Sequence, residues 1–132
     1  MRAFIDTNVL VRHLTGDPPA QAAAATAFLA AAETLYLVDL VLAEVVYVLE
    51  SYYGVSRKRV AELARAILGF AAIVAADDAL LFRALEVYET DRLDFAEAYL
   101  VACAERSDVS TIASFDRTVD RIGSVSRIEP GR

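Results

Sequence analysis

The sequence predicts a single mixed α/β domain, in which a mostly parallel sheet of short strands is covered by helices on both faces. The chain has 132 residues, and a chain of this length buries roughly two thirds of the surface that it would expose unfolded. Short apolar segments alternate with longer segments bounded by helix caps, a pattern typical of parallel sheets. No repeat or linker interrupts the chain, so we expect one domain over residues 1–132.

The first part of the chain is predicted to form, in order, strand 2–5, helix 20–32, strand 35–38 and helix 40–53. The Asp17-Pro18-Pro19 segment starts the alanine-rich first helix, because proline is favoured at helix starts. Asp39 is a suitable N-cap for the second helix, and Gly54 ends it.

The second part is predicted to form helix 57–68, strand 72–75, a helix that ends near 89, helix 95–106, strand 110–113, a short helix 117–122 and strand 125–128. Ser56, then Asp77 or Asp78, and then Asp94 are the expected N-caps. In parallel sheets, functional sites lie beyond the carboxyl ends of the strands. Asp6 and Asp116 stand there, after the first and fourth strands, although each could instead be a turn or capping residue.

Composition excludes several classes of protein. The formal net charge of −6, from 13 basic and 19 acidic residues, disfavours general coating of nucleic acid, but it does not exclude a local basic rim. Cys103 is the single cysteine, which excludes a disulfide framework and a thiolate zinc cluster and suits a reducing cytosol. We also expect no signal peptide and no membrane span, and therefore a cytoplasmic location.

Glu44 is a candidate site residue because it interrupts an apolar helix segment over 40–49. A helix that is apolar all round is predicted to be buried. A buried carboxylate must be protonated, paired or bound to a cation. The alternative is that this part of the helix reaches solvent.

Asp94 and Glu97 allow two interpretations. Asp-x-x-Glu before an apolar run is a capping-box pattern, with Asp94 at the N-cap and Glu97 at the third helical position. The same spacing places two carboxylates on one helical turn. The two roles are compatible, and both remain open from the sequence.

A cation is required if Asp6, Glu44, Glu97 and Asp116 converge. Each like-charge pair at 4 Å costs about 4 kcal/mol at an effective dielectric of 20. The candidate ligands are oxygen atoms, and His13 and Cys103 are too few for a zinc site. The set therefore predicts Mg²⁺, with Mn²⁺ as a plausible substitute.

Four ordered motifs resemble those of PIN-domain ribonucleases of the VapC toxin type. They are Phe4-Ile5-Asp6-Thr7-Asn8-Val9-Leu10-Val11, the Val-Leu-Ala-Glu-Val-Val segment around Glu44, Leu93-Asp94-Phe95-Ala96-Glu97-Ala98, and Ser114-Phe115-Asp116-Arg117. The resemblance implies a three-layer PIN-like fold and an Mg²⁺-dependent endoribonuclease. It also implies cleavage of structured RNA, such as tRNA or ribosomal RNA, and inhibition by a VapB-type antitoxin.

The resemblance assigns roles by position. Asp6, Glu44, Glu97 and Asp116 match the four catalytic, metal-binding acids, and Asp94 matches an additional metal-binding acid one turn before Glu97. Asn8 is expected to orient Asp6 by hydrogen bonding, and Ser114 stands where the family usually has threonine. Two residues depart from the pattern, because the third acid is normally aspartate and because Thr118 stands where a further aspartate is frequent. One or two metals remain possible.

The implied reaction is metal-assisted hydrolysis that leaves a 5′-phosphate, with no side chain acting as the nucleophile. Arg12 and Arg117 lie near two acid motifs and are candidate phosphate ligands, unless they are solvent-facing or salt-bridged. We expect His13 to be a packed or surface residue. Arg57-Lys58-Arg59 is expected to be a solvated face, although it could follow an RNA backbone.

Two other functions are compatible with parts of the pattern. A phosphoryl-transfer receiver needs an acidic pair after its first strand and a lysine after a later one, whereas Lys58 here starts a helix. A non-catalytic PIN-like scaffold or binding module would explain an incomplete metal site. Metal-dependent cleavage distinguishes an enzyme from such a scaffold.

Apolar residues make up 57% of the chain, against a typical value of ~45–50%. The surplus is concentrated in 20–32 and 40–53, and it predicts an interface. We therefore expect a homodimer formed through helices beside the site, with an apolar groove left for an antitoxin helix.

Overall fold

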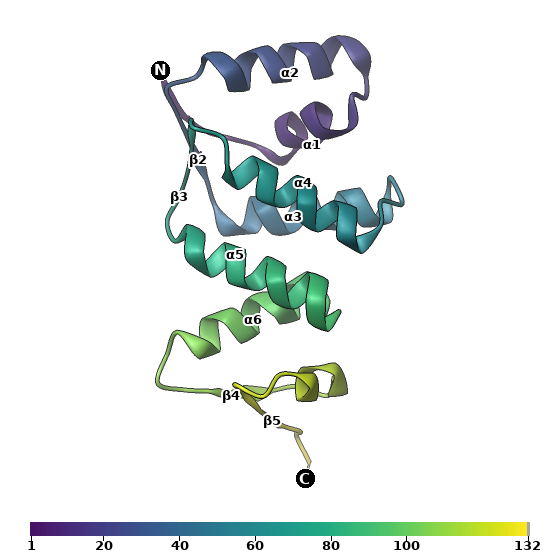
Figure 1. Ribbon diagram of the computed structural model, residues 1–132, viewed down its shortest axis with the longest axis vertical. Coiled ribbons are helices and arrows are strands. Elements are labelled where there is room, and N and C mark those ends of the chain that lie inside the picture. The colour runs from purple at the N-terminus through teal and green to yellow at the C-terminus, as the bar shows by residue number, and fades with distance from the viewer. Residues whose placement is uncertain (132) are drawn as a thin grey trace. The chain divides into compact units, whose positions relative to one another are not determined.

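A computed structural model describes residues 1–131 of the chain (Figure 1). The chain forms two compact units, Met1–Asp78 and Ala79–Arg132. Both units contain helices and short parallel strands. The predicted mixed α/β class is therefore confirmed, and the two units are described separately below.

The first unit is built on a three-stranded parallel sheet with the order β1-β2-β3. These strands are β1 (Arg2–Phe4), β2 (Thr34–Leu37) and β3 (Ile73–Ala75). Ala3 is paired with Leu35, which is paired in turn with Ile73. Leu35 and Leu37 of the central strand are almost completely buried, so this strand anchors the core of the unit.

Four helices accompany this sheet: α1 (Thr7–Thr15), α2 (Pro19–Ala31), α3 (Asp39–Ser51) and α4 (Arg57–Leu68). Helix α1 packs against α2 and α3, α3 packs against α4, and α4 contacts β3, as Figure 1 shows. Their contact faces are apolar and buried, with Leu10, Leu42, Leu49, Val60 and Ile67 inaccessible to solvent. Helix α4 has the predicted bounds because Ser56 caps its start, accepting a hydrogen bond from the Arg59 amide.

Helix α1 was not among the elements predicted from the sequence. It begins directly after Asp6, its N-cap, and ends at Gly16, which has a positive φ of 72°. The Gly16 amide donates to the Arg12 carbonyl at 2.9 Å. These two caps delimit a helix of nine residues, which is short enough that its apolar periodicity is weak evidence by itself.

The second unit contains most of α5 (Asp78–Glu86), followed by η1 (Val87–Asp91, a π-helical turn), α6 (Phe95–Glu105), β4 (Thr111–Ala113), η2 (Arg117–Arg121, a 3₁₀ helix) and β5 (Ser126–Ile128). Helix α6 packs against η1 and β4. Tyr88 and Phe95 meet edge to face, with 6.1 Å between ring centroids. Leu81, Leu85 and Leu93 complete a dry core.

The predicted strands lie in two small sheets instead of one. In the described part of the chain, β4 pairs in parallel with β5, and Thr111 is aligned with Ser126. Strands of three residues form few ladder hydrogen bonds, so these bonds alone select a partner strand only weakly. The short connection through η2, which itself contacts β5, instead brings β5 beside β4. Helix α3 also differs from expectation, because Asp39 is its first residue and not its N-cap.

Within residues 1–131, every helix is too short or too polar to cross a lipid bilayer.

A half-buried ion pair links α5 to the end of α6. The Arg83 guanidinium donates from Nε to Glu105 Oε1 at 2.8 Å and from Nη2 to Oε2 at 2.9 Å. Two parallel bonds of this kind are geometrically specific and stronger than neutral ones. Hydrogen bonding from Arg83 holds the pKa of Glu105 below its usual value.

We predict that Arg83→Met lowers the free energy of unfolding by roughly 1–3 kcal/mol at pH 7, because it leaves Glu105 without its charged partner. The lowered pKa means that this contribution is present above the unfolded-state pKa and is lost as pH falls through the folded-state value. Urea unfolding at pH 7 and pH 3 measures both effects. The control is Arg59→Met, which breaks an exposed pair with Glu62 at 3.0 Å and should change stability by less than about 1 kcal/mol.

A loss for Arg83→Met that is equal at both pH values would contradict the electrostatic explanation. It would mean that the aliphatic stem of Arg83, and not its charge, stabilises the contact between α5 and α6.

Candidate functional site

Asp6 joins β1 to α1 and serves as the N-cap of that helix. Its Oδ1 accepts a hydrogen bond from the Thr7 amide at 2.7 Å, and its Oδ2 accepts one from Asn8 Nδ2 at 3.4 Å. The structure therefore supports the capping role that the sequence left open. The cap occupies Oδ1, whereas Oδ2 has a single, long hydrogen bond, and the carboxylate is exposed.

Glu44 is exposed, so the prediction that it is buried was wrong. Leu40 and Tyr47, one turn before and after it on α3, are also exposed, by 78% and 67%. Although α3 is apolar on nearly all sides in sequence, the side of this helix that carries Glu44 is exposed to solvent. Glu44 and Asp6 line the same pocket of about 470 Å³, together with Arg12 and Asp17. The first unit thus brings together two of the five predicted metal-binding acids.

The second unit brings together the other three acidic residues. One carboxylate oxygen from each of Asp94, Glu97 and Asp116 lies within 4.8 Å of the others. Asp94 and Glu97 come from the start of α6, and Asp116 follows β4. We call these three residues the acid cluster.

The capping-box interpretation of Asp94 was wrong. Asp94 occupies the N-cap position through its backbone, and its carbonyl accepts from the Ala98 amide at 2.8 Å. Its side chain makes no capping hydrogen bond. The carboxylate instead contributes an oxygen to the acid cluster.

Asp116 is held by residues on both sides of it. Its Oδ1 accepts from the Thr118 amide at 2.9 Å and from the Thr118 hydroxyl at 2.8 Å. The Asp116 amide donates to Ser114 Oγ at 2.9 Å. The bonds from the Thr118 amide and then its hydroxyl are the main cause of a lowered pKa at Asp116, because they stabilise the ionised carboxylate.

Thr118 is therefore a site residue that the sequence analysis treated only as a departure from a family pattern. The available signal was the Asp-x-Thr spacing at the start of a short helix, which is typical of a capping hydrogen bond.

Glu97 has a raised pKa of about 7. Burial is the largest cause, followed by the hydrogen bond with Asp116 and by the negative charges of Asp116 and Asp94. Its Oε2 atom is buried and has no hydrogen-bond partner in the described chain. A buried oxygen without a partner is unusual in a folded protein. Glu97 and its two neighbours in the acid cluster together offer three carboxylate oxygens within 4.8 Å of one another. Such a set fits a hard divalent cation, so the acid cluster is suited to Mg²⁺ or Mn²⁺.

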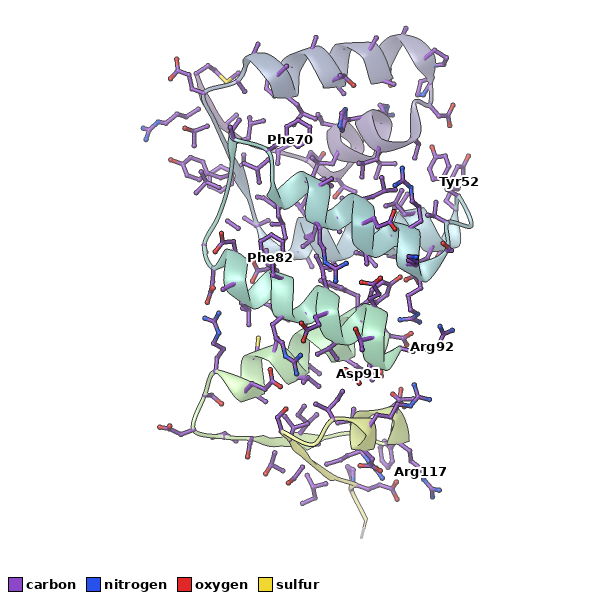
Figure 2. The ribbon with its side chains drawn as sticks, in the orientation of Figure 1. Tyr52, Phe70, Phe82, Asp91, Arg92 and Arg117 are labelled. Carbon is purple, nitrogen blue, oxygen red and sulfur yellow. The ribbon has the colours of Figure 1, made fainter. Side chains whose placement is uncertain are left out.

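The predicted basic residues lie beside these acids in the chain. Arg12 donates through Nε to the Gln21 side chain and through Nη1 to the Asn8 carbonyl at 3.3 Å. Arg117 is exposed at the first position of η2 (Figure 2). His13 is half-buried, bonded to Thr26 Oγ1 at 2.8 Å and packed edge-on against Phe70, as expected for a structural histidine.

The structure thus groups the predicted acids into two sets, one in each unit: Asp6 with Glu44, and Asp94 with Glu97 and Asp116. The convergence of Asp6, Glu44, Glu97 and Asp116 on one centre stays a prediction.

The sequence of residues 3–125 matches the model of the PIN domain family. The chain belongs to the PIN domain family. The matched range contains every acid described above. PIN domains are generally metal-dependent nucleases that act on RNA, so membership in this family supports a nuclease activity. Comparison with curated proteins found no match.

We predict that the metal affinity of this PIN domain rises with pH up to about 7. A metal ligand must be deprotonated, so binding has to release the proton that Glu97 holds below its raised pKa of about 7. The affinity for Mn²⁺ should therefore rise about tenfold per pH unit between pH 5 and 6.5 and level off near pH 8. Calorimetric titration in buffers of different ionisation enthalpy measures both affinity and proton release.

The matched variant is Glu97→Gln, which keeps the shape of the side chain but has no proton to lose. It should flatten the pH dependence and abolish proton release. Without metal, stability from protonated Glu97 is complete below its unfolded-state pKa and is lost as pH rises through about 7. An unchanged pH profile in the variant would assign the proton to another group.

Proposed function

We propose that this PIN domain is a metal-dependent endoribonuclease toxin of the VapC type that cleaves structured cellular RNA, such as tRNA or ribosomal RNA. The observation that carries the proposal is the acid cluster, in which one residue, Glu97, has a buried carboxylate oxygen, Oε2, without a hydrogen-bond partner in the described chain. Family membership supports the nuclease activity. The motifs around Asp6, Glu44, Glu97 and Asp116 support the toxin type.

In this proposal, Asp6, Glu44, Glu97 and Asp116 are the catalytic carboxylates, and Asp94 is a further metal ligand. The metal is Mg²⁺, with Mn²⁺ as a substitute. When bound, a divalent cation lowers the pKa of water and balances charge on the phosphate. Hydrolysis breaks the bond between phosphorus and the 3′ oxygen and leaves a 5′-phosphate.

Other side chains keep these carboxylates in position. Thr118 donates two hydrogen bonds to Oδ1 of Asp116. These bonds fix the orientation of the carboxylate and leave Oδ2 as the oxygen proposed to bind the metal. Asn8 donates to Oδ2 of Asp6. Ser114 accepts from the Asp116 backbone and fixes the turn that carries it. Mutation of a residue that orients a metal ligand typically lowers metal affinity or activity about 10–100-fold.

Arginine side chains are proposed to hold the RNA phosphates. Arg12 lines the pocket that contains Asp6 and Glu44, and Arg117 is exposed next to Asp116 in the chain. A guanidinium can form two parallel hydrogen bonds with a phosphate. In a protein with a net charge of −6, such local cations favour the approach of a polyanion.

We further propose a homodimer and a VapB-type antitoxin as protein partners, acting in the cytoplasm with the RNA. Helices α1 and α2 border a mostly apolar pocket of about 560 Å³ that includes Val9, Ala24 and Phe28. An antitoxin helix with aliphatic or aromatic anchors fits a surface of this type. The exposed Leu40 on α3 is a candidate for the dimer contact.

We predict that the purified protein cleaves tRNA or ribosomal RNA with Mg²⁺ and that EDTA abolishes cleavage. Asp6→Asn and Asp116→Asn should each reduce the rate more than about a hundredfold, beyond the usual effect of a residue that only orients a ligand. The matched control is Asp108→Asn, which removes the same charge at an exposed position outside both acid sets and should leave the rate unchanged. Sequencing of 5′-phosphate ends identifies the cut.

Absence of Mg²⁺-dependent cleavage from a folded protein would favour the non-catalytic scaffold. Equal losses for all three aspartate variants would show that the effect is one of net charge.

We predict a dimer of about twice the chain mass of 14.3 kDa in light scattering at micromolar concentration. Leu40→Glu should give a monomer, because a charge in an apolar contact is costly. Val109→Glu is the control, since Val109 is also exposed, by 67%, but lies in the second unit. A wild-type monomer would exclude the dimer.

A further inference from the structure

We propose that the corner between α3 and α4 binds an unpaired stretch of RNA, with one base stacked on Tyr52 and neighbouring phosphates beside Lys58. This α3–α4 corner comprises residues 52–59. The proposal rests on the proposed ribonuclease function and narrows its substrate class to RNA that is single-stranded near the cut.

The aromatic part of the α3–α4 corner is exposed and held in place. Tyr52 is 79% exposed at the C-cap of α3 (Figure 2). Its ring meets that of Tyr53 edge to face, with 4.9 Å between centroids and 68° between planes. The Tyr53 hydroxyl donates to Asp17 Oδ2 at 2.9 Å. Tyr53 therefore supports Tyr52 in one orientation and leaves an aromatic face for a ligand.

The backbone of the α3–α4 corner is also well defined. Gly54 has a positive φ of 63°, which favours glycine, and the Val55 amide donates to the Leu49 carbonyl at 3.0 Å. Ser56 then caps α4. A stacking surface on an ordered turn loses little conformational entropy on binding.

The two tyrosines belong to the same pocket as the first pair of acids. Tyr52, Tyr53, Asp6, Glu44 and Arg12 all line the pocket of about 470 Å³. A base stacked on Tyr52 therefore enters the pocket in which the proposed catalytic carboxylates of the first unit lie. Arg12 is the cation available to a phosphate there.

Basic residues follow the tyrosines directly. Arg57, Lys58 and Arg59 are consecutive at the start of α4. Lys58 and Arg59 are exposed. Arg59 pairs with Glu62 at 3.0 Å on the surface, and such a pair is weak enough for a phosphate to compete with Glu62. Three cations in sequence form a local basic site in a chain whose net charge is −6.

Nucleic acid explains this combination better than a protein partner does. Aromatic faces beside a basic strip are typical of single-strand binding, because every base can stack and every nucleotide carries a phosphate. A basic peptide would pair with Asp6 and Glu44 but would be repelled by Lys58 and its neighbours. Bases in a duplex are already stacked, so the free face of Tyr52 selects an unpaired segment, such as a loop.

The test measures binding without cleavage, in EDTA at low salt. A fluorescent twelve-nucleotide RNA without secondary structure is compared with the same strand in a duplex. Wild-type protein should bind the single strand more tightly. Tyr52→Ala should weaken that binding roughly five- to hundredfold, the range given by the loss of one stacked base. Tyr52→Phe keeps the ring and should bind like the wild type.

Tyr47→Ala is the matched control, because Tyr47 is also exposed on α3 but does not line the pocket. It should leave RNA binding unchanged. Lys58→Gln should lower the slope of log affinity against log salt by about 0.7, the value for one phosphate contact with a single strand. A 2-aminopurine base in the RNA should be quenched by wild-type protein and not by Tyr52→Ala.

Equal affinity of Tyr52→Ala and the wild type, or equal losses for Tyr52→Ala and Tyr47→Ala, would overturn the proposal. Dissociation of the dimer by Tyr52→Ala with unchanged RNA binding would assign the surface to a second copy of the chain and would also overturn the proposal.

The proposed function has a separate readout. If Mg²⁺-dependent cleavage is observed and Tyr52→Ala leaves KM unchanged, the nuclease stands and this inference fails. If binding of the single strand depends on Tyr52 as expected but no Mg²⁺-dependent cleavage is observed, this inference stands and the proposed nuclease function fails.

Discussion

Repulsion among the carboxylates of the acid cluster is the constraint on which the proposed chemistry depends. Their closest oxygens lie within 4.8 Å of one another, and each like-charge pair at about 4 Å costs about 4 kcal/mol at an effective dielectric of 20. Burial, the hydrogen bond with Asp116 and this repulsion raise the pKa of Glu97 to about 7, so the metal-free protein holds a proton on Glu97 below that pH. A cation that fits the cluster has to replace that proton. The metal affinity of the acid cluster therefore depends on the protonation of Glu97, because the proton and the cation compete for the same carboxylates.

The aspartates that follow strands combine a structural and a chemical role. Asp6 and Asp116 each accept backbone hydrogen bonds that start the next helix. At Asp116, the amide and the hydroxyl of Thr118 both donate to the same oxygen, Oδ1. Local folding thus orients these carboxylates before any ligand binds, and asparagine at either position would retain an acceptor for the cap. Charge removal can therefore be separated from loss of the helix start.

Caps and apolar periodicity were sufficient to predict most elements from the sequence. Helix α4, bounded by Ser56 and Gly69, has the predicted limits. The exposure of Glu44 was not predictable, because the residues that accompany it on the exposed side of α3 are themselves apolar. The side-chain role of Asp94 also depends on Asp116, which is distant in sequence, and a local capping pattern cannot reveal such a contact. For the same reason, the orphaned Oε2 of Glu97 has no signature in the sequence.

The parallel pairing of β4 with β5 restricts how the segment between them can vary. Parallel neighbours need a connection of about a dozen residues to reverse direction twice, and residues 114–125 are all that join these strands. This connection also carries Ser114, Asp116 and Thr118. It has no spare length, so a deletion would unpair the strands and an insertion would displace the carboxylate. Unlike most surface loops, it can diverge by substitution but not by change of length.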